Sequence, residues 1–216
     1  VQLFGFNINL NKPAPHMEPN FKFVLDAFAS KDTVKTKKDI DLRINSILIR
    51  RGKLSYDVLS EEETPGKFNP QHIKLHNIIA NISLKALQND SINAAIKRLS
   101  VDEQSGFELR KLSLKVIANN KGMKIENFAI EMPGTEMKMD TIRMEYDSLK
   151  ALNHFADNVR FSFRTLPSHV TLNDISAFVP ALSNFKEKLD LNIDVEGTLN
   201  QLNCRTLEIN AGDKFR

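Results

Sequence analysis

Three consecutive segments of the chain share one pattern of apolar residues, and this pattern constrains the fold more than any other sequence feature. Each segment reads h-x-h-x-x-h-x-h, where h is apolar and x is mostly polar. The apolar positions are Phe107, Leu109, Leu112 and Leu114, then Met123, Ile125, Phe128 and Ile130, then Met137, Met139, Ile142 and Met144. Alternation of apolar and polar residues is typical of a β-strand with one apolar face. The three segments therefore predict three similar strands joined by tight turns.

One extra residue interrupts the alternation at the same place in each segment. In a regular strand, this slip would turn the second half of the apolar set to the opposite face. Two explanations fit the sequence equally well. The slips can be a row of β-bulges that bend the sheet and keep every apolar residue inside, or they can mark a line where the apolar face changes sides. Both predict a curved sheet, with a bend line between Leu109 and Leu112, Ile125 and Phe128, and Met139 and Ile142.

The remaining segments also favour strands. From residue 72 onward, short alternating stretches are separated by hairpin-sized breaks, "QNDS", "DEQSG", "ANNKG" and "PGTE". Further strands are expected at 3–10, 159–166 and 188–210. Residues 39–58 predict either two strands or one long bent strand, with Gly52 at the break. The stretch 21–30 is ambiguous between strand and helix, and the proline-containing stretch 59–71 predicts a loop.

Two segments have helical spacing. Leu149, Leu152 and Phe155 predict a short helix within 147–157. Within 171–185 we expect a helix capped by Asn173 or Asp174 and ended or kinked at Pro180. The sequence thus predicts a mainly β fold, with a curved, largely antiparallel sheet and one or two short helices.

The length of 216 residues is enough for one domain with a core or for two small ones. We expect residues 1–216 to be one β-rich segment of a longer protein. A sub-boundary is expected near 147–172. It would divide the repeated strands of 1–146 from a helix and strand pair in 173–216.

Composition excludes several classes of protein. Apolar residues make up 41% and charged residues 26%, which is typical of a globular chain, and no apolar run reaches the roughly 18 residues of a membrane span. The net charge of +3 is too balanced to indicate a nucleic-acid partner. The most basic run, 31–53, holds eight Lys or Arg against three Asp. It is either a solvated face or a patch for anionic headgroups or phosphates.

Residues that could carry chemistry are few. His72 and His76 have the spacing of metal ligands on a helix, but on the predicted strand they would lie about 13 Å apart, which predicts two surface histidines. His154 and His169 have no partner evident in the sequence. The single cysteine, Cys204, excludes an internal disulfide and a four-cysteine zinc site, and we expect a buried, inert thiol. The sequence therefore predicts no enzyme, no cofactor and no metal.

Methionine is concentrated in one region. Five of the six methionines fall within 123–144: Met123, Met132, Met137, Met139 and Met144. Methionine is unbranched and polarisable and adapts to partners of irregular shape. The cluster is either ordinary core filling or a soft apolar surface that meets acyl chains. Tryptophan is absent, so no aromatic platform for sugars or bases is evident.

Several stretches resemble the TamB family, within the wider AsmA-like group, in its Bacteroidetes-type forms. They are "DLRINSILIRRGKLSYDV", "FNPQHIKLHNIIANISLKALQNDSINAAIKRLSVDEQSGFELRKLSLKV", "ENFAIEMPGTEMKMDTIRMEY" and "LNDISAFVPALSNF…LDLNIDVEGTLNQLNCRTLEINAGDKF". The resemblance covers nearly all 216 residues, and the order of these stretches carries it more than any one motif.

The resemblance implies an elongated sheet folded into a U-shaped, taco-like trough with an apolar interior. It implies a non-enzymatic, periplasmic portion of a long envelope protein anchored in the inner membrane. Such proteins are linked to phospholipid movement between membranes and to outer-membrane protein assembly. The expected partners are phospholipid acyl chains and, through other regions of the parent chain, an outer-membrane assembly protein. Nucleic acid is not expected.

The residues expected to face lipid are Leu109, Leu112, Leu114, Ile125, Phe128, Ile130, Met137, Met139, Ile142 and Met144. The principal alternative is a scaffold or partner-binding module of the same envelope protein, with a closed, dry core. A carbohydrate-binding β-solenoid is a further alternative, although the aromatic residues it would need are scarce.

Overall fold

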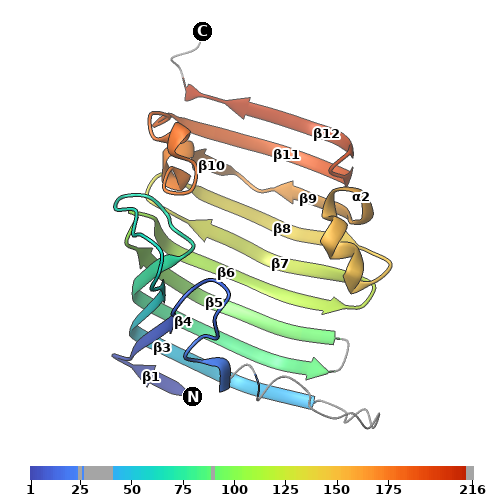
Figure 1. The fold of residues 1–216 in the computed structure, drawn as a ribbon. Helices are drawn as coiled ribbons and strands as arrows, with labels where there is room; N and C mark the ends of the chain where they lie inside the picture. Colours follow the sequence, from blue (N-terminus) through green and yellow to red (C-terminus); the bar gives the residue numbers. More distant parts are fainter. Residues whose placement is uncertain (24–25, 27–40, 89–90, 213–216) are drawn as a thin grey trace.

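The computed structural model describes residues 1–23, 26, 41–88 and 91–212. The ambiguous stretch 21–30 lies largely outside the described residues. In the described part the chain forms one curved sheet with a short α-helix and three 3-10 segments (Figure 1). The prediction of a mainly β fold built on a curved, largely antiparallel sheet is confirmed.

The sheet has twelve strands in the order β1-β3-β4-β5-β6-β7-β8-β10-β11-β12. β2 pairs with β3, and β9 pairs with both β8 and β11. β1 and β2 run parallel to β3, and every other pair is antiparallel. The elements are β1 (Gln2–Phe4), β2 (Asn7–Lys12), β3 (Asp41–Val58), β4 (His72–Gln88), β5 (Ser91–Glu103), β6 (Glu108–Asn119), β7 (Gly122–Glu131), β8 (Glu136–Glu145), η1 (Leu149–His154), α2 (Phe155–Asn158), β9 (Arg160–Thr165), β10 (Ser168–Thr171), η2 (Leu172–Ile175), η3 (Pro180–Leu182), β11 (Lys188–Thr198) and β12 (Gln201–Asn210).

The slips predicted from sequence are β-bulges. On β6, Leu109 pairs with Val101 and Leu112 pairs with Leu99. Leu99 and Val101 are two residues apart on one strand, so they share a face, and so must Leu109 and Leu112. The extra residue on β6 therefore keeps both leucines on the same side. The alternative in which the apolar face changes sides is excluded here.

The same holds on β8 and β7. Met139 pairs with Thr165 and Ile142 with Phe163, again two residues apart on the partner strand. On β7 the inserted residue is Asn127, which has a φ of 54°. This left-handed conformation suits asparagine better than most residues.

The bulges do not form one straight line, which corrects the expectation of a single shared bend. Those of β7 and β8 lie side by side, because Glu126 pairs with Thr141 and Phe128 with Met139. The bulge of β6 is offset, because Leu112 pairs with Ile130 and not with Phe128. Neighbouring strands are antiparallel, so the same sequence pattern runs in opposite directions along them. Two bulges therefore lie side by side only where the length of the connecting turn aligns them.

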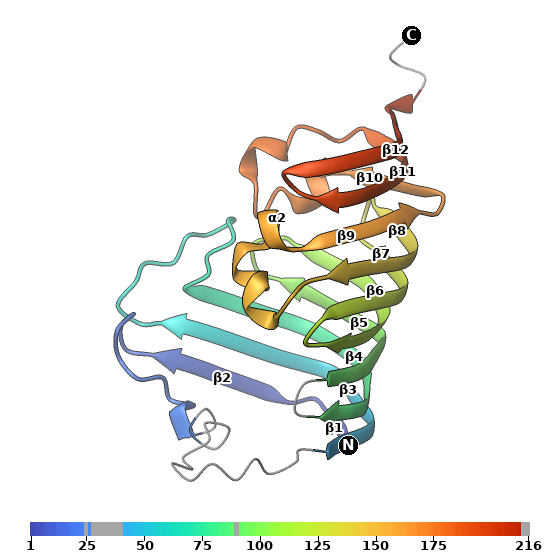
Figure 2. The ribbon, with the colours of Figure 1, turned by 90° about the vertical axis from the view of Figure 1, so that its right-hand side faces the viewer.

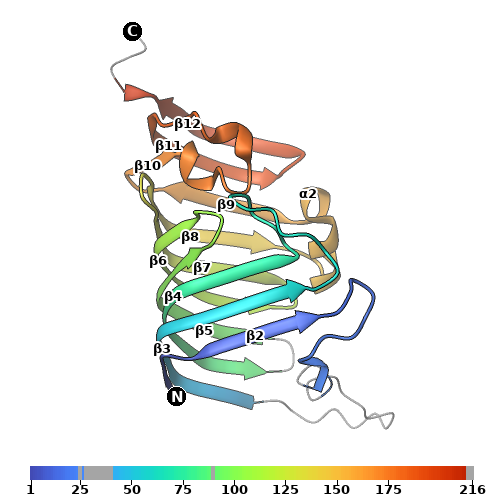
Figure 3. The same ribbon diagram turned by 60° about the vertical axis from the view of Figure 1, so that its left-hand side comes forward.

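Two further bulges lie on the long strands near the N-terminus. Arg51 on β3 and Asn77 on β4 both have a φ of 54°, and the register of the β3–β4 pair shifts beside each. β3 is therefore one long bent strand, one of the two possibilities left open by the sequence. Figures 2 and 3 show the result: the long strands turn so that their two halves face different directions.

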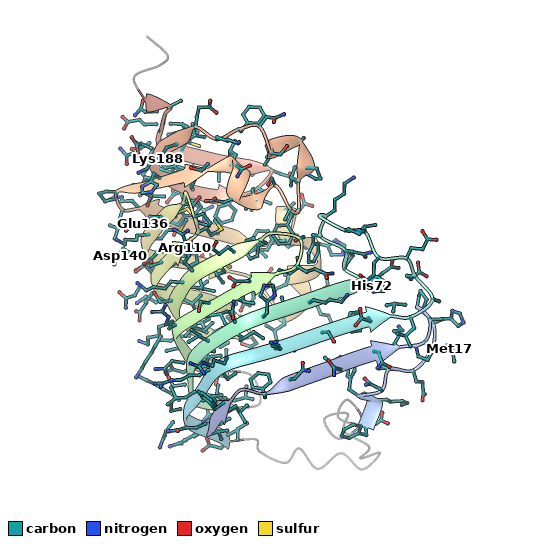
Figure 4. The ribbon with its side chains drawn as sticks, turned by 90° about the vertical axis from the view of Figure 1, so that its left-hand side faces the viewer. Met17, His72, Arg110, Glu136, Asp140 and Lys188 are labelled. Atoms are coloured by element: carbon teal, nitrogen blue, oxygen red, sulfur yellow. The ribbon has the colours of Figure 1, made fainter. Side chains whose placement is uncertain are left out.

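The inserted residues share one property that explains the direction of the bend. They are polar and exposed to solvent: Arg51, Asn77, Arg110, Asn127 and Asp140. A polar side chain without a partner is costly to bury, so each extra residue is displaced toward water. Figure 4 shows Arg110 and Asp140, with Glu136, along the outer side of the sheet.

Two predictions about local structure are wrong. Residues 171–185 form two 3-10 turns, η2 and η3, and no α-helix. Asp174 does not cap a helix, because its carboxylate accepts hydrogen bonds from the backbone N–H of Gly134 at 3.2 and 3.0 Å. Pro180 begins η3, a position that suits proline. Residues 3–10 form parts of two strands, separated at Gly5, whose φ is 64°.

The helical spacing in 147–157 corresponds to η1 and α2, which together cover Leu149–Asn158. The sheet continues across 147–172, since β9 and β10 both pair with β8 on one side and with β11 on the other.

Gly197 is the glycine whose replacement should cost most. Its φ is +134°, and a Cβ added there would lie 2.2 Å from the backbone oxygen of Gln201. We expect Gly197→Ala to lower the free energy of unfolding by about 3 kcal/mol, from backbone strain plus a clash with a backbone atom. Gly106→Ala is the matched control, since φ there is +98° but nothing lies within 4 Å of the added Cβ. Urea denaturation measures both; equal losses in the two variants would contradict the expectation.

Candidate functional site

Apolar residues form continuous rows across one face of the sheet. In one row, Val116 pairs with Ile125, Ile125 with Ile142, Ile142 with Phe163, and Phe163 with Val195. In a second row, Leu112 pairs with Ile130 and Ile130 with Met137. Residues directly opposite each other in a ladder share a face. The sequence-predicted residues of β6, β7 and β8 are therefore brought together on one surface, which we call the concave apolar surface.

The opposite face is charged. Lys115 contacts Glu126 at 2.7 Å and Lys111 contacts Glu131 at 2.8 Å across the β6–β7 pair. Hydrogen bonds from Lys115 and then from Lys124 lower the pKa of Glu126 to about 2. These pairs are exposed and add little to stability, but they identify the solvent-exposed face of the sheet.

The concave apolar surface is not fully covered. Of the ten residues predicted to lie on it, Leu109 is buried, at 7% exposure, and the other nine are partly exposed. The accessible surface of the chain, 14613 Å², exceeds the roughly 10,000 Å² expected for a compact monomer of 24.5 kDa. Within the described residues, no second sheet or long helix packs on this surface. The sheet therefore resembles an open trough more than a closed core.

Short segments close the two ends of the trough, where the strands end. At one end, Phe155 of α2 stacks on Phe161 with ring centroids 6.1 Å apart. Nearby, Leu149 of η1 lines a hollow of about 230 Å³ with Leu87, Ile92 and Ala118.

At the other end, three phenylalanine rings meet. The ring centroid of Phe178, between η2 and η3, lies 4.7 Å from that of Phe68 and 4.9 Å from that of Phe107. The backbone N–H of Phe68 donates to the carbonyl of Ala177 at 3.2 Å, which joins the 59–71 loop to the 172–185 segment. These covers explain why Leu109, near the end of β6, is buried.

The last strand extends the apolar surface without any cover. Leu207 pairs with Ile193 and Ile209 with Leu191, and both β12 residues are more than half exposed, at 58% and 55%. Cys204 pairs with Val195 and is also exposed. The prediction of a buried thiol is wrong, because β12 lies at the edge of the sheet and no element of the described residues packs on it.

His72 also differs from the prediction of a surface histidine. Its side chain is 5% exposed, because the 59–71 loop folds back over it. Nδ1 lies 3.0 Å from a carboxylate oxygen of Asp57, and Nε2 lies 3.0 Å from the carbonyl oxygen of Glu61. Ligand atoms of Asp57, Glu63 and His72 lie within 4.8 Å of one another. Each already has a partner, since Glu63 pairs with Lys74 at 2.7 Å, so we assign no metal to them.

The other histidines are not brought together. His154 lines a polar hollow of about 710 Å³ with Lys150, Asp157 and Arg160 at one end of the trough. His169 pairs with Glu136 in the sheet.

Several residues of the concave apolar surface were not identified from sequence. Phe161, Phe163 and Val195 lie on it, and Phe178 covers one end of it. The alternation of "RFSFRT" could have identified the first two, but the position of Phe178 depends on a turn that has no periodic signal.

Comparison with protein-family models, curated proteins and solved structures finds no match to this chain. Within residues 1–23, 26, 41–88 and 91–212, no helix has the length and apolar character needed to cross a membrane.

Proposed function

We propose that this chain is a non-catalytic segment of a cell-envelope protein whose trough holds the acyl chains of phospholipids. The observation that carries the proposal is the concave apolar surface itself: a sheet with ion pairs on one face and a continuous, partly exposed apolar face on the other. Large exposed apolar patches on otherwise polar proteins usually mark sites of interaction.

The chemistry of the surface fits a partner without fixed shape. Met137, Met139 and Met144 lie on it beside Ile142 and Phe128. Thioether side chains adapt to flexible hydrocarbon, and none of these five residues offers a charge or a directional hydrogen bond. Recognition would therefore depend on apolar contact, which suits acyl chains of varied length.

The remaining parts of the proposal rest on the resemblance to TamB and AsmA-like proteins. They are a location in the periplasm, an anchor in the inner membrane, and contact of other regions of the parent chain with an outer-membrane assembly protein. The shape of the trough supports the resemblance, because a curved sheet with an apolar interior is what it implies.

Native mass spectrometry of the 216-residue chain tests the proposal. After incubation with vesicles of phosphatidylethanolamine and phosphatidylglycerol, we expect adducts of one or more phospholipid masses. The dye ANS should also bind and be displaced by lipid. A chain that carries no lipid and leaves ANS fluorescence unchanged would instead be a scaffold or partner-binding module with a dry core.

A further inference from the structure

His72 is placed where both of its ring nitrogens face acceptors. The carbonyl oxygen of Glu61, near Nε2, can only accept a hydrogen bond, and so can the carboxylate of Asp57 near Nδ1 when it is ionised. A neutral imidazole has one N–H and could satisfy only one of them. The geometry therefore fits the imidazolium ion, which donates from both nitrogens.

The surrounding charges favour the cation. Asp57 comes from β3, and Glu61, Glu62 and Glu63 come from the loop that covers the ring. Lys74 lies two residues further along β4, and its ammonium group is paired with Glu63.

Glu103, at the end of β5, is also near, but its carboxylate is occupied by Ser105 and by the backbone N–H of Lys74. The hydrogen bond to Asp57 raises the pKa of His72, and burial opposes it.

The contacts of His72 fix the 59–71 loop to the sheet. Besides Glu61, the loop is held by the backbone N–H of Val58, which donates to Gln71 at 2.8 Å. The Gln104 side chain donates to the carbonyl of His72 at 3.1 Å. Further along the same loop, Phe68 packs on Phe178 over one end of the trough. The pair of Glu63 with Lys74 also links this loop to the sheet, but its two side chains are exposed. The ring of His72 is a buried titratable link between the loop and the sheet.

We propose that His72 is an imidazolium clamp that holds the 59–71 loop over one end of the trough, and that loss of its proton releases this cover. The clamp follows from geometry alone. Its consequence, that more of the concave apolar surface is uncovered when the proton is lost, rests on the proposed function of that surface.

The direction of the pH effect follows from linkage. The folded state binds the proton of His72 more tightly than the unfolded state does, so the pKa is higher in the folded state. The stabilisation is fully present below the unfolded pKa of about 6.5. It is lost as the pH rises through the folded pKa, which lies above that value. The loop should therefore loosen as the pH rises through the folded pKa.

A titration of the 15N-labelled chain followed by NMR tests the protonation state. At pH 6.5 we expect both nitrogens of His72 to carry protons, and the titration midpoint to lie above the ordinary histidine value of about 6.5. Asp57→Asn should lower the midpoint of His72, because the amide keeps a hydrogen-bond acceptor but removes the charge. A His72 that is neutral at pH 6.5, with one protonated nitrogen, would overturn the proposal.

Limited trypsin digestion at pH 6.5 tests the clamp separately from lipid binding. Lys67 is the one tryptic site within 59–71, and cleavage after the exposed Lys150 at the opposite end of the trough is the internal reference. We expect His72→Gln to raise cleavage after Lys67 roughly tenfold relative to Lys150, through loss of a charge-assisted hydrogen bond. His76→Gln should leave the ratio unchanged. Equal ratios in wild type and His72→Gln would overturn the clamp and leave the proposed lipid site untouched.

Discussion

Met139→Asp and Ile142→Asp should each lower phospholipid binding by at least roughly tenfold while the chain stays folded. Both residues are half-buried on the concave apolar surface, next to the bulge of β8. A carboxylate there would lose its water when an acyl chain covers it, at a cost of several kcal/mol. In the open trough, water reaches the new side chain when lipid is absent, so the free energy of unfolding should change little. Lipid adducts in native mass spectrometry and thermal melting by circular dichroism measure the two effects.

Ser113→Asp is the matched control for these variants. Ser113 lies on the outer face, between Lys111 and Lys115 on the same strand. The substitution adds the same carboxylate to the same sheet, but on the face that water wets. We expect unchanged lipid binding and an unchanged melting temperature.

The three variants also distinguish the alternatives. If Met139→Asp and Ile142→Asp both unfold the chain, their side chains belong to a closed core, since an unpaired buried charge is not tolerated there. If both variants bind lipid and melt like the wild type, the assignment of the apolar face is wrong.

Deletion of Asn127 should have the largest effect on folding. Without this residue β7 alternates regularly and its apolar residues stay on one face, but one half of the strand shifts by one residue against β6 and β8. If Phe128 and Ile130 keep their pairs, Glu126 moves opposite Asp140 and Ile125 moves opposite Thr141, so Ile125 loses its pair with Ile142. We expect a loss of about 4 kcal/mol in the free energy of unfolding, because the cross-strand pairs of residues 123–126 with both neighbouring strands are displaced, at roughly 0.5 kcal/mol for each pair. Urea denaturation followed by circular dichroism measures it.

The Asn127→Gly variant distinguishes the effect of strand length on stability from the effect of the asparagine side chain. Glycine adopts positive φ readily, so this variant keeps the bulge and its conformation. We expect its stability to lie within about 0.5 kcal/mol of the wild type. A deletion variant as stable as Asn127→Gly would show that the bulge does not set the register of β7 with its neighbours.

Local sequence determined the strands and their bends. Alternation placed the apolar residues of β6, β7 and β8, because the period of a strand can be read from the sequence alone. The extra residue in each segment located the irregularity within the correct interval. The choice between a bulge and a change of face needed the partner strands. It is the pairing of Leu109 with Val101 and of Leu112 with Leu99 that excludes a change of face.

Tertiary contacts decided the features that depend on residues far apart in sequence. Asp174 would cap a helix in isolation, but it accepts a hydrogen bond from Gly134, forty residues away. Cys204 has the alternation of a buried residue, yet it is exposed because β12 is an edge strand among the described residues. His72 has the spacing of a surface residue and is buried because a loop folds back over it. Periodicity specifies which side of a strand is apolar, whereas the elements that cover that side are set by pairings and turns between distant segments.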